Sequence, residues 1–231
     1  MEHAMKRKSL LLLLMMGLFG ILNIHPMAAQ TNKKDQLAKE GRTIEEVVPN
    51  GWEVQSATGD LNKDGIEDLV LLVRSNDPAY IKTRDDGFES NFSPLSLAVY
   101  LGSPSGVYKR FKVWHDTVSG REDEERDITN ELSITPKGAI DIRVSYSSNI
   151  GTDETGSITY RYRFQSGDFY LIGEESTWGN RLAAEWERTS INYLSGQKEV
   201  TSGDLITRRN LKTKQVKIKK EPLRLLGSFQ M

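Results

Sequence analysis

Residues 158–173 read I-T-Y-R-Y-R-F-Q-S-G-D-F-Y-L-I-G, and this stretch decides the class of fold. Apolar side chains recur at every second position from Ile158 to Phe164, so one face of the segment is apolar and the other polar. Ser166-Gly167-Asp168 then separates it from a second apolar run at Phe169–Ile172. A short connection containing Gly between two such runs is typical of a β-hairpin. The stretch therefore predicts two antiparallel, half-buried strands.

The same alternation extends along the chain, most clearly over residues 139–146. Helix is scarce, and the best candidate is a short turn at Thr43–Val48 that Pro49 stops. Further hairpin connections are expected at Ser103–Gly106 (between Leu95–Leu101 and Val107–Trp114), Pro136–Gly138 and Ser195–Gln197. These features predict a mainly β fold, an antiparallel meander of roughly ten strands with little helix, built as a curved sheet, a sandwich or a partial propeller. A complete propeller needs at least about four blades of four strands, which is too many for this chain.

The N-terminus has the order of a secretory signal peptide. Lys6, Arg7 and Lys8 precede an apolar stretch from residue 10 to 24, and small residues follow at Ala28 and Ala29. The apolar run is short and interrupted by Gly, whereas a transmembrane helix needs about 20 apolar residues. We expect residues 1–29 to be removed, residues 30–231 to form a single β domain without a transmembrane segment, and the protein to be periplasmic or extracellular. A retained membrane anchor is the alternative.

The charge and the cysteine content of the chain exclude several kinds of site and partner. The 231 residues carry a net charge of −1 and include no cysteine, so disulfides, thiol nucleophiles and thiolate zinc sites are excluded. Residues 201–231 are basic, with eight Lys or Arg against two Asp or Glu, and the preceding body is acidic. An acidic body disfavours nucleic acid. The lysines around Val216 and Ile218 are typical of an edge strand guarded against aggregation, and binding to an anionic envelope surface is the alternative.

A candidate metal loop reads D-L-N-K-D-G-I-E-D from Asp60 to Asp68. Oxygen-bearing side chains recur at alternate positions, and Gly65 permits a sharp bend. Calcium takes six to eight oxygen ligands, about as many as such a loop supplies with water. The predicted ligands of a structural Ca²⁺ are Asp60, Asn62, Asp64, the main-chain carbonyl of Ile66, and Asp68. The alternative is a solvated Asp/Asn/Gly turn that needs no metal.

The residues after the loop exclude an EF-hand. Position 12 of the motif is Leu71, where an EF-hand needs a bidentate Glu, and residues 69–73 favour a buried strand over an exit helix. A nine-residue acidic loop that runs directly into a strand resembles the calcium loops of FG-GAP and VCBS-type repeats, the family best known from the integrin propeller. The resemblance covers only the loop and its strand, and it implies a bound calcium ion.

A second resemblance covers more of the chain. The segments Arg161–Gly173 and Ile191–Gly196 are similar to a recurring pair of strands in uncharacterised secreted bacterial proteins that also carry one D-x-N-x-D-G-x-x-D loop near their start. This likeness implies an extracytoplasmic bacterial β-protein and no particular activity.

Catalytic motifs are few. His115 is the only histidine after residue 29, and residues 102–106 lack the spacing of a G-x-S-x-G nucleophile elbow. The acidic residues Asp153, Glu154, Glu174 and Glu175 are expected at strand ends or loops, which leaves a carboxylate-dependent hydrolase of envelope glycans or peptides as the alternative function.

The favoured function is a binding or envelope-associated module. Its protein or glycan ligand is unknown, and its oligomeric state is left open.

The long polar connection Arg74–Pro94 is predicted to be functional or disordered, and the charged run Arg121–Asp127 is predicted to be a solvated loop. Four aromatic residues are expected either to pack in the core or at a strand edge, or to form a glycan-stacking surface, namely Tyr108, Trp114, Tyr146 and Trp178.

Overall fold

The computed structural model describes residues 36–83, 87, 89–120, 126–148, 153–204, 206–207, 209 and 211–231. The predicted signal peptide lies outside these residues, as does most of the charged run 121–127. Residues Lys34–Met231 group as one compact unit. Within the described part of the chain, no helix combines the length and apolar character needed to cross a membrane.

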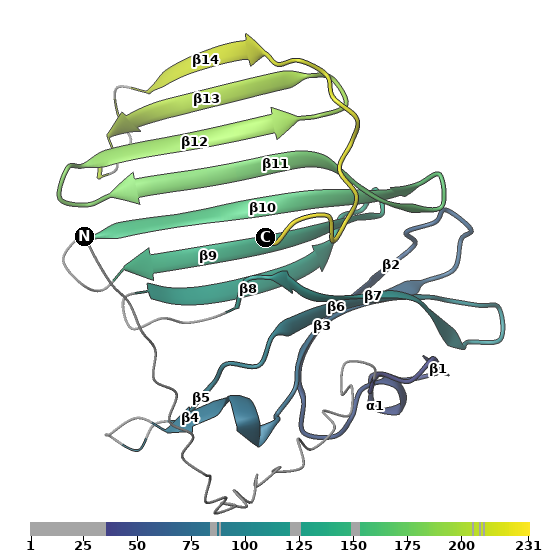
Figure 1. Ribbon diagram of the computed structural model, residues 1–231. Coiled ribbons are helices and arrows are strands. Elements are labelled where there is room, and N and C mark those ends of the chain that lie inside the picture. Colours follow the sequence, from purple (N-terminus) through teal and green to yellow (C-terminus); the bar gives the residue numbers. More distant parts are fainter. Residues whose placement is uncertain are drawn as a thin grey trace, which may run out of the picture. The chain divides into compact units, whose positions relative to one another are not determined.

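The described chain is mainly β, which confirms the predicted fold class. Its fourteen strands form two antiparallel sheets and one small hairpin, and three of the strands have only two or three residues (Figure 1). The difference from the predicted number of about ten comes largely from these short strands, whose sequences are too brief to show an alternation. The helical segments among the described residues are α1 (Ile44–Val47), inside the predicted turn, and the 3₁₀ helix η2 (Pro78–Tyr80).

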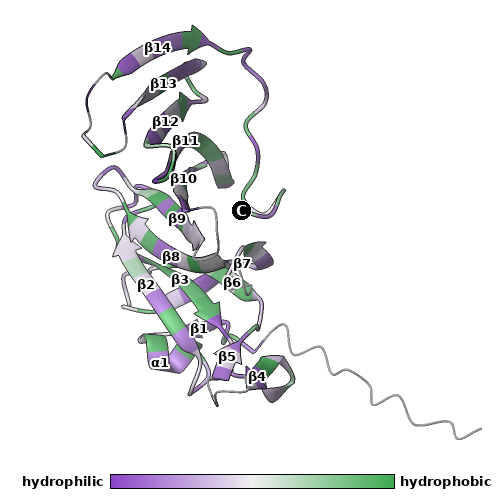
Figure 2. Ribbon diagram, turned by 90° about the vertical axis from the view of Figure 1, so that its left-hand side faces the viewer, coloured by the Kyte–Doolittle hydropathy of each residue, from purple (hydrophilic) through white to green (hydrophobic). Residues whose placement is uncertain are grey.

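The first sheet has five strands in the order β1-β7-β6-β3-β2. Their bounds are β1 Glu40–Gly41, β2 Glu53–Gly59, β3 Asp68–Arg74, β6 Leu95–Leu101 and β7 Tyr108–Val118. β3 is buried from Asp68 to Val73, as expected for the central apolar run. β2 forms an edge of the sheet and is largely exposed, and polar and apolar bands alternate along it in Figure 2.

The second sheet contains seven strands in sequence order, and it is the meander that the alternation predicted (Figure 1). Its strands are β8 Arg126–Ile134, β9 Ala139–Ser148, β10 Glu154–Gln165, β11 Asp168–Asn180, β12 Glu185–Asn192, β13 Gln197–Asp204 and β14 Lys212–Lys217. The predicted hairpin at Ser166–Asp168 joins β10 to β11, and Ser166 and Gly167 both have positive φ, as in the tight turn that matches strand twist. β14 is the fully exposed edge strand predicted from its lysines.

Parts of two predicted loops form regular structure. Arg126 and Asp127 belong to β8, so this end of the charged run is a strand rather than a solvated loop. The connection after Arg74 contains η2 and a small hairpin of β4 (Ile81–Thr83) and β5 (Glu89–Asn91). The Asp77 carboxylate accepts a hydrogen bond from the Ala79 N–H and caps η2, a local interaction that needs no apolar periodicity.

One apolar core joins the two sheets. Leu72 and Leu97 of the first sheet belong to the same buried cluster as Ile140, Tyr162 and Phe169 of the second. A smaller cluster lies on the opposite face of the first sheet, beneath the segment that contains α1. The two faces of β3 therefore both meet apolar side chains, which explains why its sequence shows no alternation.

The C-terminal residues return to this core without forming a long strand. The Leu171 N–H donates to the Arg224 carbonyl, and the Leu226 N–H donates to the Phe169 carbonyl. Met231 exchanges main-chain hydrogen bonds with Thr117 and Ser119, and its sulfur accepts from the Tyr162 hydroxyl at 3.4 Å. The side chains of Leu226 and Met231 are buried, so this segment completes the core between the sheets.

Candidate metal loop and intersheet cleft

The predicted metal loop connects the edge strand β2 to the buried strand β3. Its second residue, Leu61, is buried in the core shared by the two sheets, whereas Lys63, Asp64 and Gly65 are exposed. Burial of Leu61 anchors the start of the loop, and Asp68 anchors its end. The polar residues between them are thus held at the surface by two fixed points.

The Asp60 carboxylate organises the first half of the loop. Oδ1 accepts hydrogen bonds from the N–H groups of Lys63 at 2.7 Å and Asp64 at 3.2 Å, and Oδ2 accepts from Gly65 at 3.1 Å. The chain bends around the carboxylate because Lys63 and Gly65 adopt positive φ values of 68° and 81°. A side chain at position 65 would be strained by that backbone conformation, which accounts for the glycine.

Asn62 and Asp64 close the second half. The Asp64 N–H donates to Asn62 Oδ1 at 3.0 Å, and Asn62 Nδ2 donates to Asp64 Oδ2 at 2.8 Å. The Ile66 N–H donates to Asp64 Oδ1 at 2.8 Å. The side chains at the first, third and fifth positions therefore all form hydrogen bonds within the loop.

Asp68 differs from the other acidic residues because it is completely buried. Its Oδ2 accepts a hydrogen bond from the Leu61 N–H and its Oδ1 from the Gly102 N–H, both at 2.9 Å. Burial raises the pKa of this carboxyl, the two N–H donors oppose that shift, and the charge of Asp64 adds to it. A cation beside Asp68 and Asp64 would favour the ionised carboxylate.

Turns from both sheets contact the loop. At Gly102, which starts the connection between β6 and β7, an added Cβ would lie 2.1 Å from the Glu67 carbonyl oxygen. At Gly138, in the turn between β8 and β9, it would lie 2.2 Å from the Asp60 carbonyl oxygen. Only glycine permits either approach. The loop therefore lies where the first sheet meets the second.

The donor set fits calcium better than a transition metal. Among the described residues, no three His, Cys, Asp or Glu side chains lie close enough together to hold an ion by themselves. The predicted set combines carboxylates with one amide and one main-chain carbonyl, all hard oxygen ligands, and calcium accepts such mixed sets completed by water. Asp60, Asp64 and Asp68 are therefore not grouped as a three-carboxylate site, and the ion stays a prediction.

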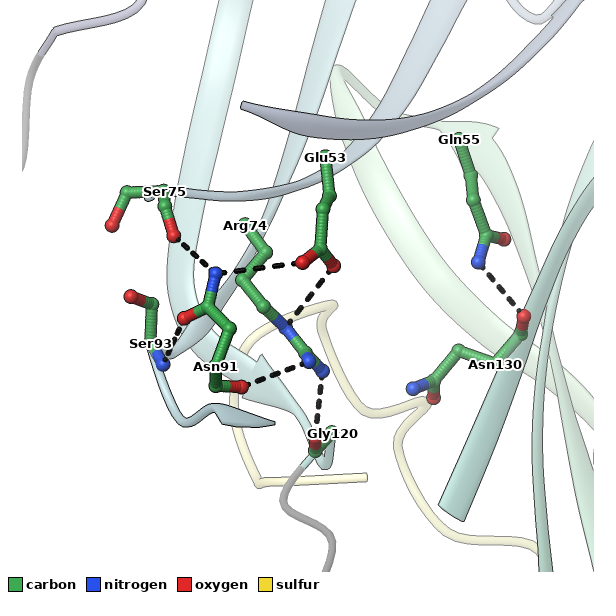
Figure 3. A network of polar contacts seen from close by, with 8 residues as sticks. All are labelled: Glu53, Gln55, Arg74, Ser75, Asn91, Ser93, Gly120 and Asn130. Atoms are coloured by element: carbon green, nitrogen blue, oxygen red, sulfur yellow. Dashed lines mark hydrogen bonds and ion pairs between the residues drawn. The ribbon is translucent and has the colours of Figure 1, made fainter. Parts of the chain in front are cut away.

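A cleft of about 340 Å³ lies between β2 and β8, the neighbouring edges of the two sheets. The edges touch where Gln55 Nε2 donates to the Asn130 carbonyl at 2.9 Å (Figure 3). The lining residues are Glu53, Val54, Gln55, Leu72, Arg74, Leu95, Ile128, Thr129 and Asn130.

Arg74 is held rigidly at one side of the cleft. Nη1 donates to the Asn91 carbonyl at 3.1 Å and Nη2 to the Gly120 carbonyl at 2.6 Å, as Figure 3 shows. Its Nε is buried and makes no hydrogen bond, although Glu53 Oε2 lies 3.9 Å away. Asn130 Oδ1, also buried, likewise lacks a hydrogen-bond partner. Sequence patterns gave no sign of this site, because Arg74 and Asn130 are 56 positions apart and neither belongs to a local motif.

The other candidate residues do not line this cleft. Glu53 is the one carboxylate that lines it, whereas most glycoside hydrolases use a pair. Glu174 accepts a hydrogen bond from the Tyr193 hydroxyl and lies 3.8 Å from Arg224, while Glu175 pairs with Arg188. Asp153 and Glu154 lie at the start of β10, and His115 Nδ1 is 3.0 Å from the Ser96 hydroxyl on the neighbouring strand β6.

The four aromatic candidates do not share one surface. Trp114 is buried and packs edge-on against Phe169 at 6.1 Å, and Tyr108 packs against the smaller core cluster. Tyr146 and Trp178 lie on the second sheet, where both pair with Gly156 from either side. Trp114 therefore packs in the core, which was one of the two alternatives predicted for these aromatic residues.

Comparisons with family models, with characterised proteins and with solved structures find no match to this chain. Its function is therefore inferred from the loop and the cleft themselves.

Proposed function

We propose that this chain is an exported, calcium-stabilised β module that binds a protein or glycan ligand outside the cytoplasm. The position of the Asp60–Asp68 loop carries the proposal: its ends are anchored by Leu61 and Asp68, and turns of both sheets pack against it. An ion held by Asp60, Asn62, Asp64, the Ile66 carbonyl and Asp68 would offset the repulsion between carboxylates at this junction. Its contribution would be structural, and the calcium loop would then match the FG-GAP and VCBS resemblance.

Export supports the choice of ion. Extracellular modules of this kind bind calcium with dissociation constants of about 10⁻⁴–10⁻³ M, which suits millimolar external calcium. A cysteine-free exported domain also has no disulfides to stabilise it, so a bound ion would supply a crosslink of another kind. Mass measurement of the protein recovered from the envelope tests export, since we expect a chain that starts at or near Gln30.

Calorimetric titration of the chelator-treated protein with calcium tests the metal site. We expect one calcium site per chain. Asp64→Ala should abolish calcium binding because it removes a predicted ligand. The fold should be retained because Asp64 is exposed and its side chain bonds within the loop. Glu221→Ala is the matched control, since this acidic side chain is 71% exposed and far along the chain from the loop. Equal calcium binding by the wild type and Asp64→Ala would refute the site.

A further inference from the structure

We infer that one end of the second sheet docks on a lipid bilayer that contains anionic lipids. The juxtaposition that carries the inference is two neighbouring strand connections with exposed aliphatic side chains, which lie beside the start of the lysine-rich edge strand β14. The inference goes beyond the proposed function and does not depend on the metal loop.

The most exposed large apolar side chains among the described residues lie in these two connections. Leu182, between β11 and β12, and Ile206, between β13 and β14, are each 73% exposed. Leu211, just before β14, follows at 53%. Exposed apolar side chains that gather in one place mark an interaction site, whereas scattered ones are normal on any protein surface.

Strand pairing places both connections at the same end of the sheet. Asn180, the last residue of β11, pairs with Glu185 at the start of β12, and Glu185 pairs with Asp204 at the end of β13. The three strand ends therefore form one row. In Figure 1 this end lies on the left, where β11 and β13 end and β12 and β14 begin.

Hydrogen bonds within each connection fix its shape. The Ala183 N–H donates to Asn180 Oδ1 at 2.8 Å, so the first connection folds over the end of β11. In the second connection, Asp204 Oδ1 accepts from the N–H groups of Ile206 at 3.0 Å and Thr207 at 2.6 Å. Leu182 and Ile206 thus belong to turns that are already shaped, so docking them costs little conformational entropy.

Leu211 extends the apolar surface onto one face of the sheet. A Cβ added at Gly203 would lie 2.8 Å from Leu211 Cδ2, and Gly203 pairs directly with Trp186 on β12. Residues directly opposite each other in an antiparallel pair point to the same face, so Leu211 and Trp186 share a face. Tryptophan is enriched at bilayer–water interfaces.

Basic side chains accompany the apolar ones. Arg181 and Arg209 are exposed in the two connections, and the exposed strand β14 carries Lys212, Lys214 and Lys217 and no acidic residue. Lysine and arginine beside exposed aliphatic side chains are typical of segments that lie in an anionic bilayer interface, where the charges meet the headgroups.

Carboxylates lie at this end as well. They are at the strand ends beneath the connections and belong to Asp153, Glu154, Glu185 and Asp204. Because they offset part of the basic charge, electrostatic attraction is not sufficient by itself. The aliphatic side chains must therefore enter the bilayer for stable docking.

A bilayer fits this end of the sheet better than a folded protein does. The most exposed residues are leucine and isoleucine on separate turns, whereas hot spots of protein interfaces are enriched in Trp, Tyr and Arg and fill packed pockets. A fluid apolar layer accepts separate aliphatic side chains without complementary pockets, to a depth of about 5–10 Å.

Cosedimentation with vesicles tests the inference on the exported protein. Mass measurement of its first residue ensures that no N-terminal apolar segment contributes. One set of vesicles is phosphatidylcholine alone, and the other is equal parts of phosphatidylcholine and phosphatidylglycerol. We expect binding to the mixed vesicles, at least about tenfold weaker binding to the neutral ones, and weaker binding as salt is raised.

The double substitution Leu182→Ser with Ile206→Ser should weaken binding to the mixed vesicles at least about tenfold, because it removes apolar contact outside the core. Leu194→Ser is the matched control, since Leu194 is exposed in the turn between β12 and β13, at the opposite end of the sheet. We expect this control to bind like the wild type.

The basic residues are tested in the same way. Replacing Lys212, Lys214 and Lys217 with Ser should weaken binding to the mixed vesicles at least about tenfold and reduce its dependence on salt. Lys137→Ser, in the exposed turn between β8 and β9, is the control and should bind like the wild type.

A second measurement leaves the apolar side chains unchanged. Ala183→Cys and Ser195→Cys each accept one environment-sensitive dye, because the chain has no other cysteine. Both positions are exposed, and they lie at opposite ends of the sheet. Mixed vesicles should shift the emission of the dye at position 183 to shorter wavelength and leave that at position 195 unchanged.

The inference is overturned if neither kind of vesicle binds the wild type, if Leu194→Ser loses as much affinity as the double variant, or if the dye at position 195 responds instead. Self-association without vesicles that the double substitution abolishes would also overturn it, and would assign this end to a contact between copies of the chain. Asp64→Ala should bind vesicles like the wild type, so failure of the metal site and failure of docking are separate results.

Discussion

The buried Asp68 carboxylate accepts a hydrogen bond from the Gly102 N–H, 34 positions away, at 2.9 Å. Its other oxygen accepts from the Leu61 N–H at the start of the metal loop. One side chain thus ties the end of the loop to its start and to the next turn of the first sheet. Asp68 is consequently a structural residue as well as a predicted ligand.

Replacing Asp68 with Asn should destabilise the protein both with calcium and with chelator. The amide retains one acceptor oxygen, so one of the two main-chain N–H groups loses its partner at a cost of about 1–3 kcal/mol. Asp64→Asn should have little effect in chelator, because Asp64 is exposed. Urea unfolding of both variants measures the difference, and equal unfolding free energies in chelator would contradict the structural role of Asp68.

The C-terminal segment should contribute strongly to stability through Leu226. This side chain is 2% exposed and lies in the core between the sheets, so Leu226→Ala should lower the unfolding free energy by about 2–5 kcal/mol. Its neighbour Leu225 is 38% exposed and provides the control, for which a loss below about 1 kcal/mol is expected. Similar losses for the two variants in urea unfolding would show that the segment is not packed as described.

Stability should fall at alkaline pH because of buried tyrosines. Burial raises the pKa of Tyr160, Tyr162 and Tyr193 in the folded protein. Their contribution is complete below the unfolded pKa of about 10 and is lost as pH rises through the folded values, because the unfolded chain releases these protons first. Tyr162→Phe should therefore show a shallower alkaline decline than the wild type.

Urea unfolding between about pH 8 and 11 measures that slope. Tyr80→Phe serves as the control for removal of a tyrosine hydroxyl, since Tyr80 is 45% exposed. Identical pH profiles for Tyr162→Phe and the wild type would contradict the burial of this hydroxyl.

The lysines of β14 should protect the open edge of the second sheet. Replacing Lys212, Lys214 and Lys217 with Ser removes the charges that oppose pairing with another chain, so oligomers should form at a lower protein concentration. Substitution of Lys137, in an exposed turn, is the control. Light scattering against concentration distinguishes the variants, and a scattering profile equal to that of the wild type would leave the lysines without this guarding role.

Local signals predicted the meander, the hairpin turns and the guarded edge strand. Alternating residues such as Ile140 and Ile142 show which face is buried, and Ser166-Gly167 shows where the chain reverses. The return of Met231 to Tyr162 and the hydrogen bond from Gln55 to the Asn130 carbonyl were not predicted. They depend on how the two sheets meet, and no periodicity encodes that arrangement.

In the metal loop too, local features were predictable from the sequence, whereas contacts with distant segments were not. The oxygens of Asp60, Asn62 and Asp64 were predicted from spacing alone, and the structure shows how main-chain N–H groups fix them. The contacts of the loop with Gly102 and Gly138 involve turns far along the chain. Spacing could predict a ligand set, and it could not predict that the loop lies between the sheets.

Melting curves in calcium, magnesium and chelator test the calcium proposal most directly. With a dissociation constant of about 0.1 mM and about 1 mM free calcium, binding to the folded state alone adds about 1.4 kcal/mol. The melting temperature of the wild type should therefore rise by roughly 3–6 °C in calcium, and by much less in magnesium, which dehydrates reluctantly and demands a tighter octahedron. Asp64→Ala should show no calcium response. Coincident curves for the calcium-loaded and fully stripped wild type would contradict the proposal and leave residues 60–68 as an ordinary turn.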